Sequence, residues 1–279
     1  FADLTAQCDF GPRAPGAAGH AACRQWLLAQ LQAATSDVTA QDFTYQAATG
    51  ETFTFTNIVA GFPAGADFSD GILLGAHWDT RPVADRDPDP TKRDEPILGA
   101  NDGASGVAVL LELARHFKQS PPTRPVVIAL FDFEDGGLTP LTTGEPLSGF
   151  SIGARRFAAQ PGRYRTAEAV VVDMVGDQHL SLPREPNSEQ ANPELVERIW
   201  SAAERLGFAA FQDRFGPAIT DDHIPLIEVG IPAVDLIDFD YPGPNAHHLW
   251  HTTQDVPANC SAESLRVVGQ TLLQTLYGS

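Results

Sequence analysis

Runs of apolar residues alternate along the chain with stretches in which apolar positions recur at helical spacing. Residues 71–77 (GILLGAH) and 125–132 (PVVIALFD) are almost continuously apolar, as strands buried on both faces are. Residues 103–118 repeat apolar positions at the spacing of one helix face. The pattern predicts strands near 37–46, 52–61, 71–77, 125–132, 170–175 and 232–237, and helices near 17–34, 103–118, 150–160, 193–206 and 262–277, with a short helix after 221–225.

This alternation of strands and helices predicts an α/β fold in which helices cover both faces of a central sheet. No internal repeat or linker interrupts residues 1–279, so we expect one domain. Two stretches rich in turn-forming residues, 79–98 and 136–149, are predicted to be loops. Long ordered loops in compact domains are often functional.

The composition is that of a globular protein, since 43% of the 279 residues are hydrophobic. No apolar run approaches the roughly 20 residues of a membrane-spanning helix, so we expect no membrane span. The formal net charge of −18 opposes binding to nucleic acid, which needs clustered Lys and Arg. It favours a cationic partner such as a peptide with a free N-terminal ammonium, although most of the charge is expected only to aid solubility.

The chain holds three cysteines, Cys8, Cys23 and Cys260. They could be three small buried residues. Alternatively, a disulfide between Cys8 and Cys23 could join the N-terminal segment to the first helix, and Cys260 would then be unpaired. We predict the Cys8–Cys23 disulfide, and with it an oxidising compartment that is periplasmic or extracellular. Phe1 stands at the start in place of Met, so we expect a mature or trimmed product.

Candidate metal ligands stand at the ends of several predicted elements. His77, Asp135 and Asp173 follow or end apolar strands, Asp102 precedes a helix, and His251 lies in a loop. In open α/β sheets, sites form outside the carboxyl ends of the strands, so these segments should meet at one edge. Imidazole nitrogens and carboxylate oxygens are ligands of catalytic zinc. The sequence therefore predicts a zinc site of the hydrolase type.

Two short motifs pair a ligand candidate with a second polar group. In HWD, His77 and Asp79 lie two positions apart on a strand and point to the same side, so one could bind metal while the other orients it. In FDFED, Glu134 and Asp135 are adjacent and diverge. One of them could bind the cation while the other faces substrate as a proton shuttle.

The remaining candidates have structural alternatives. Asp102 could cap the helix that follows it, although the small residues after it leave space for a metal, which we favour. Asp173 is the single charge in an apolar strand and needs a cation or a donor. Asp221 and Asp222 in DDHIP could hold a substrate amine, join a hydrogen-bond network or cap a helix. Trp250 could form an apolar wall for a small side chain.

Seven motifs in order resemble those of the zinc-dependent glutaminyl-peptide cyclotransferases, or glutaminyl cyclases, and especially the bacterial relatives of the animal enzymes. The motifs are HWDTRP, DPDP, PILGANDGASGVAVLLELAR, LFDFED, DMVG, DDHIP and WHTTQD. The resemblance runs from about residue 8 to the C-terminus. It implies the zinc aminopeptidase-like fold, a single-domain three-layer α/β/α sandwich whose central sheet is mixed and mostly parallel.

Carried over motif by motif, the resemblance implies one Zn²⁺ held by Asp102, Asp135 and His251. The other implied roles are Glu134 as general acid and base, Asp173 and Asp221 in the proton and substrate network, and Asp221 and Trp250 in contact with substrate. The implied reaction cyclises an N-terminal Gln to a pyroglutamyl residue and releases ammonia. The expected partners are peptides or proteins that begin with Gln, and a monomer is expected.

This chain departs from the animal enzymes at three positions that bear on the site. Their second pocket Trp, a few residues after the Glu pair, aligns near Pro140, so another residue has to close the pocket. Asp135 stands where they carry Glu, and both residues can bind zinc. Asp235 stands where they carry His, so that part of the network differs.

A rival enzyme hypothesis is an aminopeptidase with two zinc ions. It would place His77, Asp102 and Asp135 on one metal and Asp102, Asp173 and His251 on the other, and would use a metal-activated water as nucleophile. The Trp before His251, the doubled acid of DDHIP and the HWDTRP–DPDP segment favour the cyclase. A non-enzymatic binding module is a third hypothesis, but no ligand has been lost. We find no nucleophile elbow, phosphate loop or nucleotide fingerprint.

Overall fold

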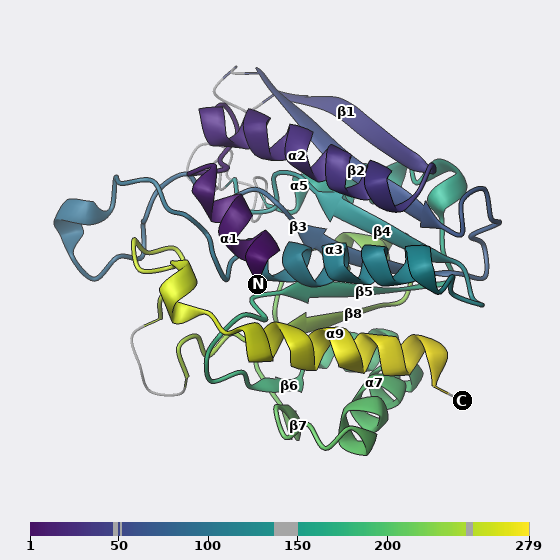
Figure 1. Cartoon of the computed structure of the whole chain (residues 1–279). Coiled ribbons are helices and arrows are strands. Elements are labelled where there is room, and N and C mark those ends of the chain that lie inside the picture. The colour runs from purple at the N-terminus through teal and green to yellow at the C-terminus, as the bar shows by residue number, and fades with distance from the viewer. Residues whose placement is uncertain (47–49, 51, 137–149, 244–247, 279) are drawn as a thin grey trace.

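The computed structural model describes residues 1–46, 50, 52–136, 150–243 and 248–278. A six-stranded sheet lies between two layers of helices (Figure 1). In spatial order the strands are β1 (Val38–Gln46), β2 (Thr52–Phe62), β4 (Val126–Phe131), β3 (Ile72–His77), β5 (Glu168–Asp173) and β8 (Ala233–Ile237). β2 is antiparallel to β1 and to β4, whereas β4, β3, β5 and β8 run parallel. The predicted α/β fold with a mixed, mostly parallel sheet is confirmed.

Two layers of helices bury the two faces of the sheet. One layer contains α1 (Ala2–Asp9), α2 (Ala18–Ala34), α3 (Ala104–Gln119), α7 (Pro193–Arg205) and α9 (Ala262–Tyr277). The other contains α5 (Ile152–Ala159) and α8 (His223–Glu228). Within the described residues, no helix has both the length and the apolar character needed to cross a bilayer.

Each central strand divides its side chains between these two layers. In β4, Ile128 and Leu130 pack into the cluster under α2, α3 and α9, while Val127 and Ala129 pack into the cluster under α5 and α8. Successive residues of a strand point to opposite faces of the sheet. A strand covered on both sides therefore has to be apolar at every position, which explains the continuous apolar runs in the sequence.

Several short elements were not predicted. They are α1, β6 (Leu182–Arg184), α6 (Pro186–Ala191) and β7 (Phe211–Phe215), and the single turns η1 (Pro90–Lys92), η2 (Gly162–Tyr164) and η3 (Pro257–Asn259). Such segments are too short to repeat an apolar period, so periodicity does not reveal them. The strand predicted at 170–175 begins and ends two residues earlier as β5. Apart from Gly136, the loop predicted at 136–149 lies outside the described residues.

The parallel strands bring the candidate ligands to one edge of the sheet. β3 ends at His77 and β5 ends at Asp173, while β4 ends just before the FDFED acids. This edge lies at the left in Figure 1, where the blue loop 78–98 and the yellow segment that precedes α9 also lie. Ligands from distant parts of the sequence therefore share one neighbourhood, as sheet topology predicts.

The predicted disulfide between Cys8 and Cys23 is wrong. Both residues, and Cys260, are free thiols, and each is buried. Cys8 and Cys23 pack among apolar side chains of the layer that contains α1 and α2, where a thiol fills space as a small apolar group would. Burial raises the pKa of Cys8 to about 11 and that of Cys23 to about 12. The argument for an oxidising compartment therefore loses its basis.

We expect the native protein, prepared without reductant, to react with Ellman's reagent at no thiol, because the thiolate is the reactive form and these thiols are buried and protonated. After denaturation, three thiols per chain should react. A Cys8–Cys23 disulfide would leave a single reactive thiol in the unfolded chain, and that count would contradict the structure.

Candidate metal and active site

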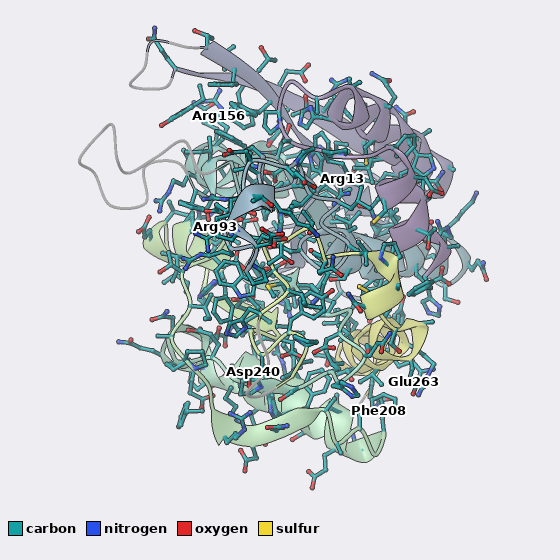
Figure 2. All side chains as sticks on the ribbon, turned by 90° about the vertical axis from the view of Figure 1, so that its left-hand side faces the viewer. Arg13, Arg93, Arg156, Phe208, Asp240 and Glu263 are labelled. Carbon is teal, nitrogen blue, oxygen red and sulfur yellow. The ribbon has the colours of Figure 1, made fainter. Side chains whose placement is uncertain are left out.

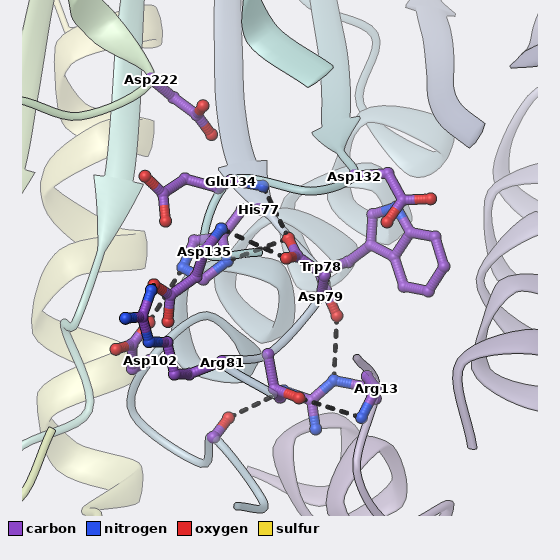
Figure 3. Close-up of polar contacts among 12 residues, drawn as sticks. Arg13, His77, Trp78, Asp79, Arg81, Asp102, Asp132, Glu134, Asp135 and Asp222 are labelled. Carbon is purple, nitrogen blue, oxygen red and sulfur yellow. Dashed lines mark hydrogen bonds and ion pairs between the residues drawn. The ribbon is translucent and has the colours of Figure 1, made fainter. Parts of the chain in front are cut away.

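Asp79 joins the segments that follow β3 and β4. Its two carboxylate oxygens accept hydrogen bonds from the backbone N–H groups of Glu134 at 3.0 Å and Asp135 at 3.2 Å (Figure 3). One of these oxygens also lies 3.5 Å from Nδ1 of His77. Asp79 is fully buried. It therefore faces the ring of His77, as the HWD spacing predicted, and in addition fixes the backbone of the Glu134–Asp135 pair.

Asp255 holds the backbone of the loop that carries Asp102. Its carboxylate accepts hydrogen bonds from the N–H groups of Asn101 at 2.8 Å and Asp102 at 3.2 Å, and from the hydroxyl of Tyr241 at 3.2 Å. Asp102 does not cap α3, because the N-cap residue is Gly103 and no side chain makes a capping bond there. The helix-capping alternative for Asp102 is therefore excluded.

Both oxygens of Asp102 face histidines instead. One oxygen lies 3.1 Å from Nε2 of His77, and the same nitrogen lies 3.1 Å from an oxygen of Asp173. The other oxygen lies 3.4 Å from Nε2 of His251, whose Nε2 is 2.9 Å from an oxygen of Asp135. The structure thus forms two His–carboxylate groups that share Asp102.

This grouping corrects the ligand partition in the two-zinc hypothesis. His77 pairs with Asp173, and His251 pairs with Asp135, whereas the hypothesis had exchanged Asp135 and Asp173. The exchange arose because order along the chain does not say which strand ends are neighbours. β3 lies directly between β4 and β5, so His77 at its end can reach either side.

Asp102, Asp135 and His251 have the donor types of a catalytic zinc site, namely two carboxylates and one imidazole. Their ligand atoms all lie within 4.8 Å of one another, and all three residues are buried. Oδ2 of Asp135 is buried, and its close polar neighbour is Nε2 of His251 at 2.9 Å. Two buried carboxylates that share one imidazole call for further positive charge, so these residues fit zinc.

A cavity of about 340 Å³ opens beside this group, a size suited to a small ligand. Its apolar wall is formed by Phe150, Met174, Ile219, Ile237, Phe239 and Trp250. Asp102, Asp135 and His251 line it together with Glu134, Asp173 and Asp221. His77 does not line the cavity and is only 1% exposed. All three members of the His251 triad therefore line the cavity, whereas His77 of the other group does not.

Three acids that line the cavity, Glu134, Asp173 and Asp221, have raised pKa values, whereas the pKa of Asp102 is lowered by His251 and His77 although burial opposes this. Burial raises the pKa of Glu134 well above its ordinary value, and the charges of Asp135 and Asp221 raise it further. Burial also raises the pKa of Asp221, and it raises that of Asp173 to about 7 although His77 opposes this shift. Acids of this kind in a cavity are suited to accept and return protons.

In the metal-free chain, both site histidines favour the protonated form. Burial opposes the charge on each ring, but Asp173 and Asp102 raise the pKa of His77 well above its ordinary value. Asp135 and Asp102 do the same for His251. Because a metal ligand has to be deprotonated, a bound cation would take the place of a proton on His251.

The DDHIP segment adds a second group of buried acids. Asp222 is the N-cap residue of α8, yet its side chain makes no capping bond. Oxygens of Asp221, Asp222 and Glu134 lie within 4.8 Å of one another, and burial together with Asp221 raises the pKa of Asp222 well above its ordinary value. His223 lies beside them, with Nδ1 3.6 Å from Asp235. Such a group favours a cationic ligand such as an amine.

The described residues with positive φ, glycine apart, all border the site. They are Phe133 at 61°, Ser151 at 53°, Met174 at 50° and His251 at 56°. Phe133 precedes Glu134, Met174 follows the last residue of β5, and the N–H of Ser151 donates to the carbonyl oxygen of Glu134 at 2.8 Å. Left-handed backbone at such residues costs about 1–3 kcal/mol each and is found mainly at functional sites.

Arg13 is a buried support that the sequence did not indicate. Its guanidinium donates to the carbonyl oxygens of Trp78 at 2.9 Å, Leu98 at 2.7 Å and Gly99 at 2.8 Å (Figure 3). It thereby joins the segment after β3 to the loop before α3. A single Arg in an irregular segment forms no pattern. Asp255, by contrast, is the last residue of WHTTQD, so the motif contained a signal for it.

A family model described as Peptidase family M28 matches residues 57–276, and the chain therefore belongs to this family. The glutaminyl cyclase of Bacteroides thetaiotaomicron, solved with N-acetylhistamine, is 34% identical with a TM-score of 0.91, covering 100% of this chain and 96% of that chain. A Zn-dependent exopeptidase from Parabacteroides distasonis is 36% identical with a TM-score of 0.92 and the same coverage. Bovine glutaminyl-peptide cyclotransferase is 26% identical over 88% of this chain and 73% of its own length. The resemblance to glutaminyl cyclases is confirmed.

We expect zinc binding to release protons and to weaken as the pH falls from about 8 to about 6, where an imidazole with a raised pKa holds its proton. Calorimetry in two buffers of different ionisation enthalpy would count the protons. His251→Ala should lose the zinc, while His179→Ala, a change at an exposed histidine, should keep it. Zinc binding without proton release would contradict the assignment of His251 as a ligand.

Proposed function

We propose that this protein is a zinc-dependent glutaminyl-peptide cyclotransferase. It converts the N-terminal Gln of a peptide to a pyroglutamyl residue and releases ammonia. The observation that supports this most directly is the lining of the cavity. One triad, Asp102, Asp135 and His251, lies on it beside Glu134 and Trp250, while His77 is buried away from it.

The proposed chemistry takes place within one residue of the substrate. A bond forms between the α-amine nitrogen and the side-chain carbonyl carbon, and the bond from that carbon to the amide nitrogen breaks. Glu134 takes a proton from the attacking amine and later gives a proton to the nitrogen that leaves as ammonia. Because nucleophile and carbonyl belong to the same Gln, the site has only to hold them in reacting geometry.

Asp102, Asp135 and His251 would hold the zinc. When bound, zinc supplies a Lewis acid that polarises the side-chain carbonyl. Asp221, on the cavity wall near Glu134, would attract and orient the substrate amine. Asp173, 3.1 Å from His77, would complete the proton network, and Trp250 would contact the methylene groups of the Gln side chain.

One observation supports the alternative aminopeptidase hypothesis. His77, Asp102 and Asp173 form a second group whose ligand atoms could hold a metal ion. A catalytic metal has to offer an open coordination position to substrate or water. His77 does not line the cavity, which argues against that role here, so the second group is proposed to serve as a hydrogen-bonded support for Asp102.

We expect the zinc-loaded protein to convert a Gln-initiated peptide to a product lighter by one ammonia, detected by mass spectrometry. Glu134→Gln should lower kcat by about 10²–10⁴-fold, because general acid–base catalysis contributes that much. Zinc content should be retained. The matched control is Glu112→Gln, which changes an exposed residue paired with Arg115 on α3 and should keep full activity. Unchanged turnover in Glu134→Gln would show that the proton shuttle is assigned wrongly.

Zinc content should be about one ion per chain after dialysis, because one triad lines the cavity with all three of its members and forms the proposed site. Atomic absorption on the purified protein measures this number, and the product analysis accompanies it. Two ions per chain, together with removal of the first residue of the peptide, would support the aminopeptidase instead.

Three further expectations are also kept as proposals. They are a single catalytic domain over residues 1–279, a monomer, and a location outside the cytoplasm. The location no longer has the support of a disulfide. Light scattering and fractionation of the producing cells test the second and third of them.

A further inference from the structure

Arg86 is an exposed cation on the wall of the candidate active cavity. Its guanidinium carbon lies 5.1 Å from the centre of the Trp250 ring, and both residues line the cavity. Among the described residues, no carboxylate forms an ion pair with Arg86. Arg86 therefore places a positive charge on the cavity wall of a chain whose net charge is −18.

The acidic neighbours of Arg86 in the sequence are both bound elsewhere. Asp85 pairs with Arg81 at 2.8 Å and also lies 3.5 Å from Nδ1 of His251. Asp87 accepts hydrogen bonds from the N–H of Thr253 at 3.0 Å and from its hydroxyl at 2.7 Å. Neither carboxylate is therefore available to neutralise Arg86.

Arg81 shows the contrasting case on the same wall. It is half-buried, pairs with Asp85, and has a nitrogen 3.5 Å from an oxygen of Asp135. Its positive charge is therefore neutralised by carboxylates inside the site. Arg86 differs because its guanidinium is presented to whatever enters the cavity.

The backbone holds Arg86 close to the metal triad. Its N–H donates to the carbonyl oxygen of His251 at 3.1 Å, which is the residue after Trp250. The bonds of Asp87 to Thr253 join the same two loops a second time. Arg93, from the loop that carries Arg86, lies on the face that is turned to the viewer in Figure 2. The position of Arg86 is thus coupled to the loop that carries a proposed zinc ligand.

We propose that Arg86, stacked on Trp250, is a subsite for a carboxylate in the part of the peptide that follows the N-terminal Gln. The carboxylate would be an acidic side chain at the second position or the C-terminus of a very short peptide. This rests on the proposed function, because the Gln residue would occupy the acidic end of the cavity near Glu134 and Asp221. A planar guanidinium fixed on an aromatic ring is well suited to bind a carboxylate.

The test compares kcat/KM for two pairs of peptides. Gln-Glu-Ala amide against Gln-Gln-Ala amide tests the side-chain source, and Gln-Ala acid against Gln-Ala amide tests the C-terminal source. In at least one pair, the wild-type protein should prefer the acidic member by about two- to fivefold, the range of an exposed ion pair. The preference should lie in KM, with kcat unchanged, and should shrink between about 20 mM and about 500 mM salt.

Arg86→Gln should abolish this preference by lowering kcat/KM for the acidic peptides to the level of their neutral partners. The control is Lys92→Gln, which removes one positive charge from the same loop at a residue that does not line the cavity. It should keep the preference. Equal kcat/KM values within both pairs for the wild type would overturn the subsite. A uniform loss on all four peptides in Arg86→Gln would also overturn it, since that result would mean that Arg86 only supports Trp250.

If none of the four peptides yields a pyroglutamyl product, it is the proposed function that fails. The subsite is then judged by calorimetric binding of the same peptides to the zinc-loaded protein. Tighter binding of an acidic peptide, lost in Arg86→Gln, would support the subsite, and equal affinities would overturn it.

Discussion

The need of buried carboxylates for positive charge governs this site. Asp102, Asp135, Asp173 and Asp221 are all buried at one edge of the sheet. An isolated charge in such a place is strongly unfavourable, so each carboxylate has to find a cation, a donor or a proton. His77 and His251 meet part of this need. A divalent ion bound by Asp102, Asp135 and His251 would supply the remaining positive charge. The chain belongs to the M28 family, to which zinc enzymes also belong.

The scaffold holds these ligands mainly through their backbones. Asp79 fixes the amides of the Glu134–Asp135 pair, Asp255 fixes the loop of Asp102, and Arg13 joins two of the ligand-bearing segments. The ligand side chains are left free to face a cation. The residues with left-handed backbone lie in or next to the loops that carry the ligands. These loops are anchored to strand ends, so their backbone cannot relax independently.

Solved relatives described as a glutaminyl cyclase and as a Zn-dependent exopeptidase are about equally similar to this chain. Both metal-type groups are present, and residue identity alone does not separate the alternatives. The distinction depends on access. All three members of one triad line the cavity, whereas His77 of the other group does not, and only an accessible metal can bind a substrate.

The sequence by itself determined the α/β fold and singled out the Asp and His residues that gather at one edge of the sheet, because continuous apolar strands and polar residues at their ends form strong local patterns. It could not pair His77 with Asp173, reveal Arg13, or show that Cys8 and Cys23 stay unpaired. These features depend on which segments become neighbours in space, and order along the chain does not encode that directly. Short elements such as β6 were missed for a related reason, since packing rather than periodicity stabilises them. Only the tertiary structure decided which triad faces the cavity, because exposure is a property of the assembled fold.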